Sequence, residues 1–285
     1  MLNIMFATCL GSIMDKTLDS GSGDAGSIPV QGTNESNFEV THVKEKIYTI
    51  PVTDAFQVDS ECPFCVLENK LEEERLAYYL GGALMEPDCR QDMNAHGFCK
   101  AHLDALFQSK QNVLGLGLIL TSYFDQYNQK LSNLTNASLE SSKKDEKKSM
   151  FSKKNNGNSL DELKEFLRSS RSDCTLCNQL EETMKRYISV FYHMWRTEKE
   201  FRVVFESKKG FCAKHFQRLL EEIEGGLKPN ERQLFLKVLF AQQIENLSRL
   251  RNEVKWFTEK FDYQNNEEPW GNSRDAVPRC IEKLR

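Results

Sequence analysis

Apolar residues recur at intervals of three and four positions through most of the chain after Glu61, which is the spacing of one face of an α-helix. Leu76 and Tyr79 show this spacing in the first half, and Ile188 and Phe191 show it in the second. Sustained alternation of apolar and polar residues, the pattern of a half-buried strand, is missing. The pattern therefore predicts an all-α fold.

Helix start and stop residues divide this pattern into separate helices, since proline suits a first helical turn and paired glycines end a helix. The predicted helices run from Pro63 to about Leu80, from Ala83 to Met93, from Phe98 towards Leu134 with a break near Gly115 and Gly117, from Leu160 onward, from Cys174 to about Arg202, from Gly210 to Glu224, and from Pro229 to about Phe261. Residues 47–52 alternate briefly, and we expect a short extended segment there before a brief helix capped by Thr53 or Asp54.

The same succession of elements occurs twice, which indicates an internal duplication with two similar helical lobes. A stretch dense in Gly, Ser, Asp and Asn precedes the first lobe, and a stretch of Ser, Lys and Asn separates the two. The predicted organisation is a disordered N-terminal extension (1–43), a first metal-binding lobe (44–135), a flexible linker (136–158), a second metal-binding lobe (159–262) and a C-terminal docking tail anchored by Trp270 (263–285).

One arrangement of cysteine and histidine also occurs twice, with its copies about 112 residues apart. Each copy is a C-x2-C pair followed some 35 residues later by G-F-C-x2-H, and together they use six of the nine cysteines and two of the five histidines. Three thiols and one imidazole are the donor set of a closed tetrahedral metal site. The predicted ligands are Cys62, Cys65, Cys99 and His102 in the first lobe, and Cys174, Cys177, Cys212 and His215 in the second.

We expect each lobe to gather its own four ligands at helix N-termini, where the positive ends of the helix dipoles favour thiolates. Sites that combine the C-x2-C of one lobe with the C-x2-H of the other are the alternative geometry. Gly97 and Gly210, which precede the Phe-Cys pairs, suit a backbone that turns into a helix with positive φ. Phe98 and Phe211 are expected to cover the sites with apolar surface.

Zinc is the default ion for closed sites with three sulfurs and one nitrogen. An iron–sulfur cluster is the main alternative, because thiolates dominate the donor set and histidine can replace one of them. Thiol exchange at the C-x2-C pairs is a weaker interpretation, since it leaves the C-x2-H pairs unexplained.

Composition and charge limit the kinds of partner that the protein could bind and indicate its cellular compartment. The net charge of −4 and pI near 5.9 make nucleic acid an unlikely partner, and no apolar stretch is long enough to cross a membrane. Met1–Met14 lacks the basic region of a signal peptide. Cys9, Cys89 and Cys280 have no counterpart in the repeat, which fits a reducing compartment, so we expect a cytoplasmic protein.

Several stretches resemble an uncharacterised bacterial family of unknown function (DUF6062), some of whose members are labelled "ABC transporter substrate-binding protein". The stretches are Lys44–Val52, Glu61–Cys65, Leu84–Asp88, Gly97–Cys99 with His102, Leu114–Leu118, Cys174 with Cys177, Gly210–Cys212 with His215, and Pro269–Asn272. The resemblance covers roughly residues 44–285 and implies a bacterial helical protein without an assigned activity. The transporter label gains no support from the sequence, which shows neither a signal peptide nor alternating strands and helices.

These features favour a metal-stabilised protein with an interaction or regulatory role and an unidentified protein partner. The alternative function is an iron–sulfur redox or sensor protein. A hydrolytic metalloenzyme fits least, because catalytic zinc keeps an open coordination position and the chain contains no H-E-x-x-H, glycine-rich phosphate loop or G-x-S-x-G motif. The sequence therefore identifies no catalytic residue.

Overall fold

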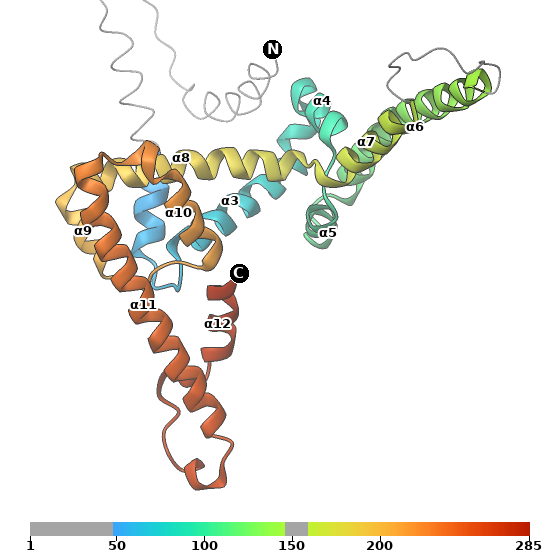
Figure 1. The fold of residues 1–285 in the computed structure, drawn as a ribbon. Helices are drawn as coiled ribbons and strands as arrows, with labels where there is room; N and C mark the ends of the chain where they lie inside the picture. The colour runs from blue at the N-terminus through green and yellow to red at the C-terminus, as the bar shows by residue number, and fades with distance from the viewer. Residues whose placement is uncertain (1–47, 146–158) are drawn as a thin grey trace, which may run out of the picture. The chain divides into compact units, whose positions relative to one another are not determined.

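The structure is a computed structural model that describes residues 48–145 and 159–285 (Figure 1). Helices make up 83% of it and no strand occurs in these two ranges, so the predicted all-α fold is confirmed. The extended segment expected near residues 47–52 is wrong in its described part, because residues 48–57 are helical. Val52, Ala55 and Phe56 are buried along one side of this helix, at the spacing of a helical face. The predicted extension at 1–43 lies outside the described residues.

The chain divides into two compact units. In the described ranges, one comprises residues 72–145 and 159–180, here called the middle unit. The other comprises residues 48–71 and 181–285, here called the flanking unit. The division falls inside two helices, α3 (Pro63–Tyr79) and α8 (Thr175–Thr197), so each of these helices contributes residues to both units. The units thus group the chain differently from the consecutive segments 44–135 and 159–262.

The middle unit contains short helices followed by a long helical pair. After α3 come the 3-10 helix η1 (Gly82–Met85), α4 (Pro87–His96), α5 (Lys100–Gln108), α6 (Val113–Asp145) and α7 (Ser159–Ser172). Helices α6 and α7 lie side by side (Figure 1), and the rings of Tyr127 and Phe166 pack between them with centroids 5.0 Å apart.

The break predicted near Gly115 and Gly117 lies earlier, between α5 and α6. Lys110 adopts a φ of 52° in this connection, and the Asn112 side chain accepts a hydrogen bond of 2.7 Å from the Gly115 backbone. Asn112 thus satisfies a free N–H of the first turn of α6, and both glycines lie within that helix. The predicted linker is likewise helical up to Asp145, and its remaining residues, 146–158, lie outside the described ranges.

The flanking unit is built around an aromatic core. Its elements are residues 48–57, the first turns of α3, the later part of α8, α9 (Lys199–Glu206), α10 (Ala213–Gly226), α11 (Pro229–Glu259), η2 (Tyr263–Asn265), η3 (Gly271–Ser273) and α12 (Ala276–Leu284). Fully buried phenylalanines fill its centre: Phe56, Phe64, Phe191, Phe205, Phe211 and Phe235. Their ring centroids lie between 5.1 and 6.4 Å from neighbouring rings, which suits edge-to-face and offset contacts.

Two predicted boundaries shift within the flanking unit. The helix predicted from Cys174 to Arg202 is divided at Glu198 into α8 and α9, and the Arg202 guanidinium lies over the Trp195 ring at 4.6 Å. Beyond α11, Trp270 packs on Phe257 with a centroid separation of 5.9 Å, and the Trp256 indole donates to the Pro269 carbonyl at 3.0 Å.

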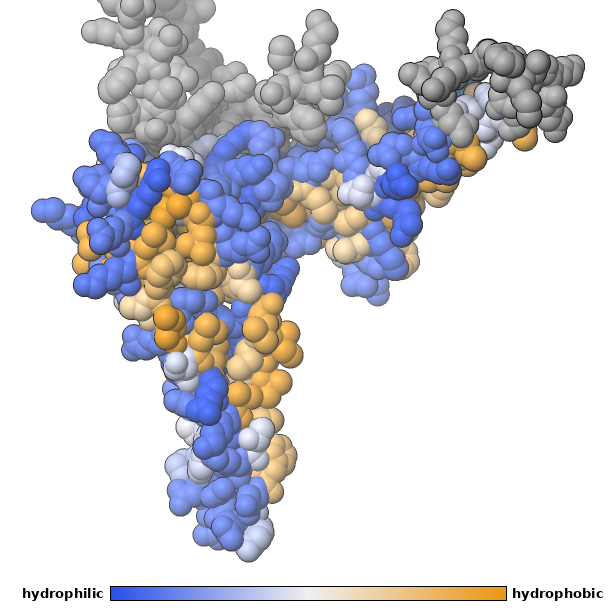
Figure 2. Space-filling model, in the orientation of Figure 1, coloured by the Kyte–Doolittle hydropathy of each residue, from blue (hydrophilic) through white to orange (hydrophobic). Residues whose placement is uncertain are grey.

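The surface of the flanking unit carries exposed apolar side chains over α11 and α12 (Figure 2), including Phe240, Ile244, Ile281 and Leu284. None of the described helices combines the length and the apolar character needed to span a bilayer.

Candidate metal centres

The eight predicted ligands form two groups of four, but not the groups expected. Cys62 and Cys65 meet Cys212 and His215 in the flanking unit, here called the Cys62 cluster. The second group lies in the middle unit and is here called the Cys174 cluster; it contains Cys99, His102, Cys174 and Cys177. Each cluster therefore takes its C-x2-C pair from one repeat and its C-x2-H pair from the other.

The prediction that each lobe gathers its own four ligands is wrong, and helix lengths give the physical reason. Helix α3 starts directly after Cys62, includes Cys65 and runs for 17 residues, which is a rise of about 26 Å. The return helix α4 has only 10 residues, a rise of about 15 Å, so it is too short to retrace the length of α3.

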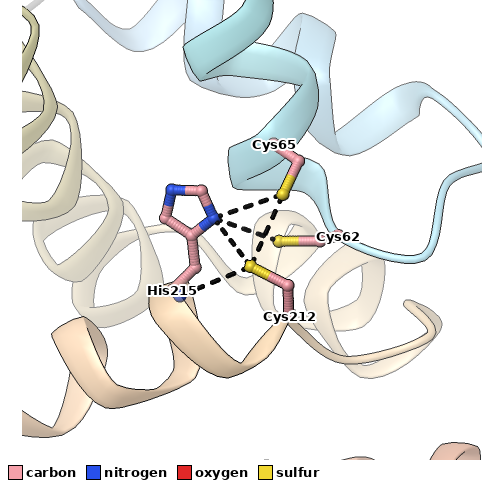
Figure 3. Close-up of side chains that lie close together, drawn as sticks. All are labelled: Cys62, Cys65, Cys212 and His215. Atoms are coloured by element: carbon pink, nitrogen blue, oxygen red, sulfur yellow. Dashed lines mark hydrogen bonds between the residues drawn. The ribbon is translucent and has the colours of Figure 1, made fainter. Parts of the chain in front are cut away.

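The Cys62 cluster is a compact arrangement around the His215 ring (Figure 3). Nδ1 of His215 lies 3.5 Å from the Cys62 sulfur, 3.4 Å from the Cys65 sulfur and 3.2 Å from the Cys212 sulfur. The sulfurs of Cys65 and Cys212 are 3.5 Å apart. Cys62, Cys212 and His215 are buried, while Cys65 is half-buried.

The Cys174 cluster has nearly the same dimensions. Nδ1 of His102 lies 3.3 Å from the sulfurs of Cys99 and Cys174 and 3.4 Å from that of Cys177. The sulfurs of Cys99 and Cys177 are 3.9 Å apart. Cys174 and His102 are buried, whereas Cys177 is exposed.

Both clusters match the dimensions of a tetrahedral ion site. In each, all four donor atoms lie within 4.8 Å of one another. Around a tetrahedral ion with metal–sulfur bonds of about 2.3 Å and metal–nitrogen bonds of about 2.0 Å, sulfurs are separated by about 3.8 Å and sulfur and nitrogen by about 3.5 Å. The distances above agree with these values, so each group could hold one ion without rearranging the backbone.

The local sequence places the donors through helix starts and glycine turns. Cys99 and Cys212 are the N-cap residues of α5 and α10. The preceding glycines have positive φ, 63° at Gly97 and 79° at Gly210, as predicted from their positions. A Cβ on Gly97 would lie 2.7 Å from the Tyr123 ring, so close packing adds a second reason for glycine there.

Gln243 holds the backbone beside Gly210 in place. Its side-chain oxygen accepts a hydrogen bond of 2.9 Å from the Phe211 N–H, and its side-chain nitrogen donates one of 2.8 Å to the Phe211 carbonyl. Phe211 is fully buried and packs on Phe64, whose ring centroid also lies 5.8 Å from that of His215. Phe211 therefore provides apolar packing next to the Cys62 cluster, whereas Phe98 is half-buried and contacts Tyr79.

Replacing Gly210 by Ala is expected to destabilise the protein by about 1–3 kcal/mol. The backbone at this position is left-handed, and a residue with a Cβ is strained in that conformation. The new Cβ would also lie 2.6 Å from the Gln243 oxygen and disturb the two hydrogen bonds between Gln243 and the Phe211 backbone. Gly225→Ala is the matched control, since Gly225 lies in α10 with nothing within 4 Å of the position that a Cβ would occupy. Denaturant unfolding of both variants checks this; equal midpoints for the two would contradict it.

Each histidine also faces a carboxylate of α3 on the side of the ring away from the sulfurs. Nε2 of His215 lies 3.6 Å from Glu68, and Nε2 of His102 lies 3.3 Å from Glu72. Lys214 donates to the other Glu68 oxygen at 2.6 Å. The Glu72 carboxylate is within hydrogen-bond distance of His102 and would hold its ring with Nδ1 towards the sulfurs, whereas Glu68 and the Nε2 of His215 face each other at a distance too long for a hydrogen bond.

Sequence reasoning missed Glu68 and Glu72 as supporting residues. The acidic stretch of α3 reads as a solvated helix face, and the second repeat has Leu180 and Met184 at the corresponding positions. Their spacing of four residues, on the helix that starts with Cys62 and Cys65, is the one signal that could have pointed to them.

Glu68→Gln is expected to weaken metal binding at the Cys62 cluster by about 10–100-fold, because the amide loses the charge that faces His215. Glu72→Gln should do the same at the Cys174 cluster only. Glu73→Gln, which removes an exposed carboxylate from the same helix, is the control. Competition with a metal chelator measures the metal affinity of each cluster. If all three variants weakened binding equally, Glu68 and Glu72 would act only through the overall charge of the helix.

Protonation differs among the sulfurs when no ion compensates their charge. Hydrogen bonding to Cys212 and Cys62 raises the pKa of Cys65, and hydrogen bonds from Cys62 and Cys65 lower the pKa of Cys212. Burial lowers the pKa of His215, but its hydrogen bonds to Cys212 and Cys62 outweigh burial and bring the pKa to about 9. Without an ion, the Cys62 cluster therefore holds protons that an incoming ion must displace.

Burial controls the second cluster. It raises the pKa values of the Cys174 and Cys177 thiols, and it lowers the pKa of His102 despite the neighbouring Glu72. The Cys174 and Cys177 thiols are therefore protonated at neutral pH in the absence of an ion.

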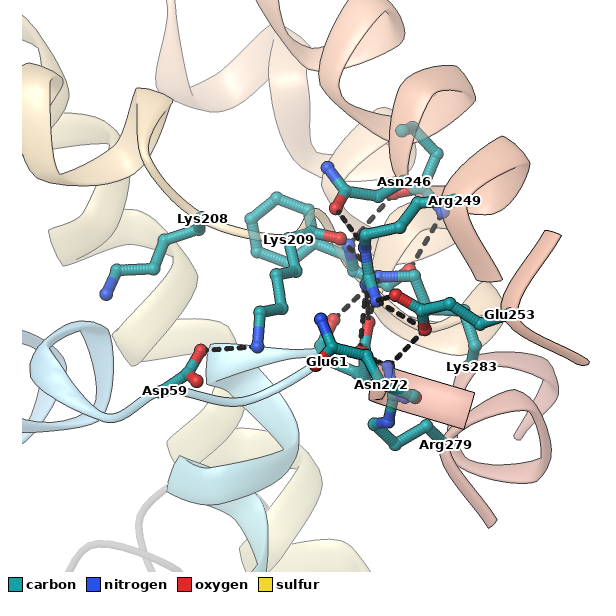
Figure 4. A network of polar contacts seen from close by, with 12 residues as sticks. Asp59, Glu61, Lys208, Lys209, Asn246, Arg249, Glu253, Asn272, Arg279 and Lys283 are labelled. Atoms are coloured by element: carbon teal, nitrogen blue, oxygen red, sulfur yellow. Dashed lines mark hydrogen bonds and ion pairs between the residues drawn. The ribbon is translucent and has the colours of Figure 1, made fainter. Parts of the chain in front are cut away.

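The residue before Cys62 anchors a buried ionic network (Figure 4). The Glu61 carboxylate is 3% exposed and accepts from Arg249 at 2.6 Å and from Arg279 at 3.3 Å, while Lys283 donates to its backbone carbonyl at 2.7 Å. Arg279 and Lys283 belong to α12, so the C-terminal helix is tied to the segment that carries Cys62. Burial makes such a network costly to break at one member.

The residue before Cys174 is likewise held by polar partners. Asp173 lies 2.5 Å from Nδ1 of His96 and accepts from the Asn178 side chain at 2.9 Å. The Thr175 N–H donates to the Gly97 carbonyl at 3.0 Å. The C-x2-C segment of one repeat is thus joined directly to the glycine turn of the other, within the middle unit.

The remaining described cysteines lie outside both clusters. Cys89 is fully buried in α4, and its sulfur lies 3.3 Å from the Tyr78 hydroxyl. Cys280 is a half-buried thiol of α12. Cys9 lies outside the described residues. The repeat correctly separated Cys89 and Cys280 from the eight residues that come together.

An all-helical chain with two buried or partly buried Cys3His groups of ion-site dimensions belongs to the class of candidate metal-binding helical proteins. The chain is a member of the family of unknown function DUF6062, whose model matches residues 43–285. Comparisons with curated proteins and with solved structures gave no match.

Proposed function

We propose that this protein binds two zinc ions as structural centres, one in each cluster, and that the metal-bound fold serves an interaction or regulatory role in the bacterial cytosol. The carrying observation is that eight donors from four separate segments converge into two four-donor groups of tetrahedral dimensions. A site whose four positions are all filled by protein ligands is structural, because no position remains for substrate.

Charge and helix geometry support the choice of ion. Three thiolates, one neutral imidazole and a divalent ion leave one negative charge on each cluster. Cys99 and Cys212 stand at helix N-caps, and Cys62 and Cys174 directly precede α3 and α8. The positive ends of these helices would stabilise the net negative charge. The recurrence of this arrangement supports an origin by internal duplication.

An iron–sulfur cluster remains the alternative function, as a redox carrier or sensor. In such a cluster the irons are bridged by sulfide, so ligands on different irons lie farther apart than ligands of one ion. Separations within 4.8 Å for all four donors favour a single ion in each group.

Metal content decides between these functions. Protein purified without oxygen is expected to be colourless and to contain about two zinc ions per chain. A brown protein with acid-labile sulfide would support the iron–sulfur function instead. A folded protein that contains no metal at all, and takes up none when zinc is supplied, would contradict both.

A further inference from the structure

Solvent reaches the sulfurs of the two clusters to different extents. In the Cys62 cluster, Cys62 and Cys212 are buried and Cys65 is half-buried. In the Cys174 cluster, Cys177 is exposed and Cys99 is half-buried. A small reagent in water therefore meets Cys177 more readily than any of the other seven ligands.

The exposed sulfur also has a suitable neighbour. The sulfur of Cys99 lies 3.9 Å from that of Cys177, and it is the half-buried thiol of the cluster. The two residues come from the starts of different helices, α5 and α8. Cys174 is fully buried behind them, so it is shielded from the solvent side.

We propose that Cys177 is an oxidation site for small hydroperoxides, with Cys99 as the partner that forms a disulfide and releases the ion of the Cys174 cluster, while the Cys62 cluster retains its ion. This inference rests on the proposed function, because bound metal keeps both sulfurs as thiolates, which are the nucleophilic form.

The chemistry balances with one equivalent of hydrogen peroxide. The Cys177 thiolate attacks one peroxide oxygen, an S–O bond forms, the O–O bond breaks and hydroxide leaves, which gives a sulfenic acid. The Cys99 thiolate then attacks that sulfur, an S–S bond forms, the S–O bond breaks and a second hydroxide leaves. Two thiolates have given two electrons to one peroxide, and the two hydroxide ions take protons from the buffer to become water.

Formation of this disulfide removes two of the four ligands of one ion. His102 and Cys174 alone do not retain a tetrahedral zinc ion, so the metal departs. At the Cys62 cluster the most accessible sulfur, Cys65, is half-buried, and the sulfurs of Cys62 and Cys212 are buried. Attack there is slower for lack of access.

The test uses the full chain loaded with two zinc ions and treated with one equivalent of hydrogen peroxide under anaerobic conditions. A chromophoric chelator reports released zinc, and peptide mapping after alkylation identifies the disulfide. We expect about one zinc ion to be released per chain, with a Cys99–Cys177 disulfide, and both to be reversed by a thiol reductant and added zinc.

Three outcomes would overturn the proposal: release of both ions at equal rates, oxidation of the Cys62 cluster first, or a disulfide that leaves out Cys177 or Cys99. Cys280→Ser, which removes a half-buried thiol outside both clusters, must behave like the unaltered protein. The metal count before peroxide is added tests the proposed function separately. Two bound ions that are then lost together would refute the oxidation site alone.

Discussion

Replacing Cys212 by Ser is expected to remove one of two bound zinc ions and to destabilise the flanking unit by more than about 4 kcal/mol, a loss typical of a missing structural metal. Binding free energy that exists only in the folded state is folding free energy, so a lost ligand acts on stability directly. Cys99→Ser is expected to have the corresponding effect on the middle unit. Metal analysis and amide hydrogen exchange, compared between residues 48–71 with 181–285 and residues 72–180, measure both effects.

Because each cluster combines residues of both repeats, the loss of one ligand should destabilise segments of both repeats. Cys212→Ser should increase hydrogen exchange around Cys62 and Cys65, which belong to the other repeat, and leave the segment around Cys99 and His102 protected. Cys280→Ser should keep both ions and cost no more than an ordinary single substitution. Increased exchange around Cys174 and Cys177 in the Cys212→Ser protein, with Cys62 and Cys65 still protected, would contradict the observed pairing.

Zinc affinity at both clusters is expected to fall by at least tenfold for each pH unit between 8 and 6, because every bound ion displaces at least one proton. The direction of this change in affinity follows from the protonation of the clusters without metal. The pKa of His215 is about 9, and burial raises the pKa values of Cys174 and Cys177, so protons occupy these groups at neutral pH. Lowering the pH favours the protonated groups and therefore releases the ions.

Chelator competition at several pH values measures this dependence, and thermal unfolding at each pH reports its consequence for stability. The melting temperature of the zinc-loaded protein should fall with pH towards that of chelator-treated protein. An affinity that does not change between pH 6 and 8 would mean that the bound ions displace no protons, and the eight residues would not be the ligands.

The sequence predicted the eight residues that come together but not their pairing, and chain entropy explains why spacing could not decide. Closing a site within one repeat spans 34 residues from Cys65 to Cys99, whereas the observed clusters span 72–78 and 147–153 residues. Each doubling of loop length costs only about 0.6 kcal/mol. Such small differences leave the choice to helix lengths, which the sequence pattern fixes to within a few residues and no better.

Helix boundaries were likewise predicted where they depend on the residue itself and missed where they depend on a side-chain contact. Pro63 and Pro229 begin helices as predicted, since proline's fixed φ suits a first turn whatever surrounds it. The break between α5 and α6 depends on Asn112, whose cap on Gly115 is a side-chain contact without a strong sequence signal. Glu68 and Glu72 were hidden for a related reason, because an acidic residue on a helix face looks solvated until its partner histidine is located.

The first repeat alone could not complete either of the two four-residue clusters. A chain with only the first repeat would carry Cys62, Cys65, Cys99 and His102, which in the full protein belong to two different clusters. Two copies of such a half would have to exchange them, the C-x2-C of each meeting the C-x2-H of the other, and would form two identical sites related by a twofold axis. The tandem arrangement joins both halves covalently, so the concentration-dependent assembly of a symmetric dimer becomes an intramolecular folding step.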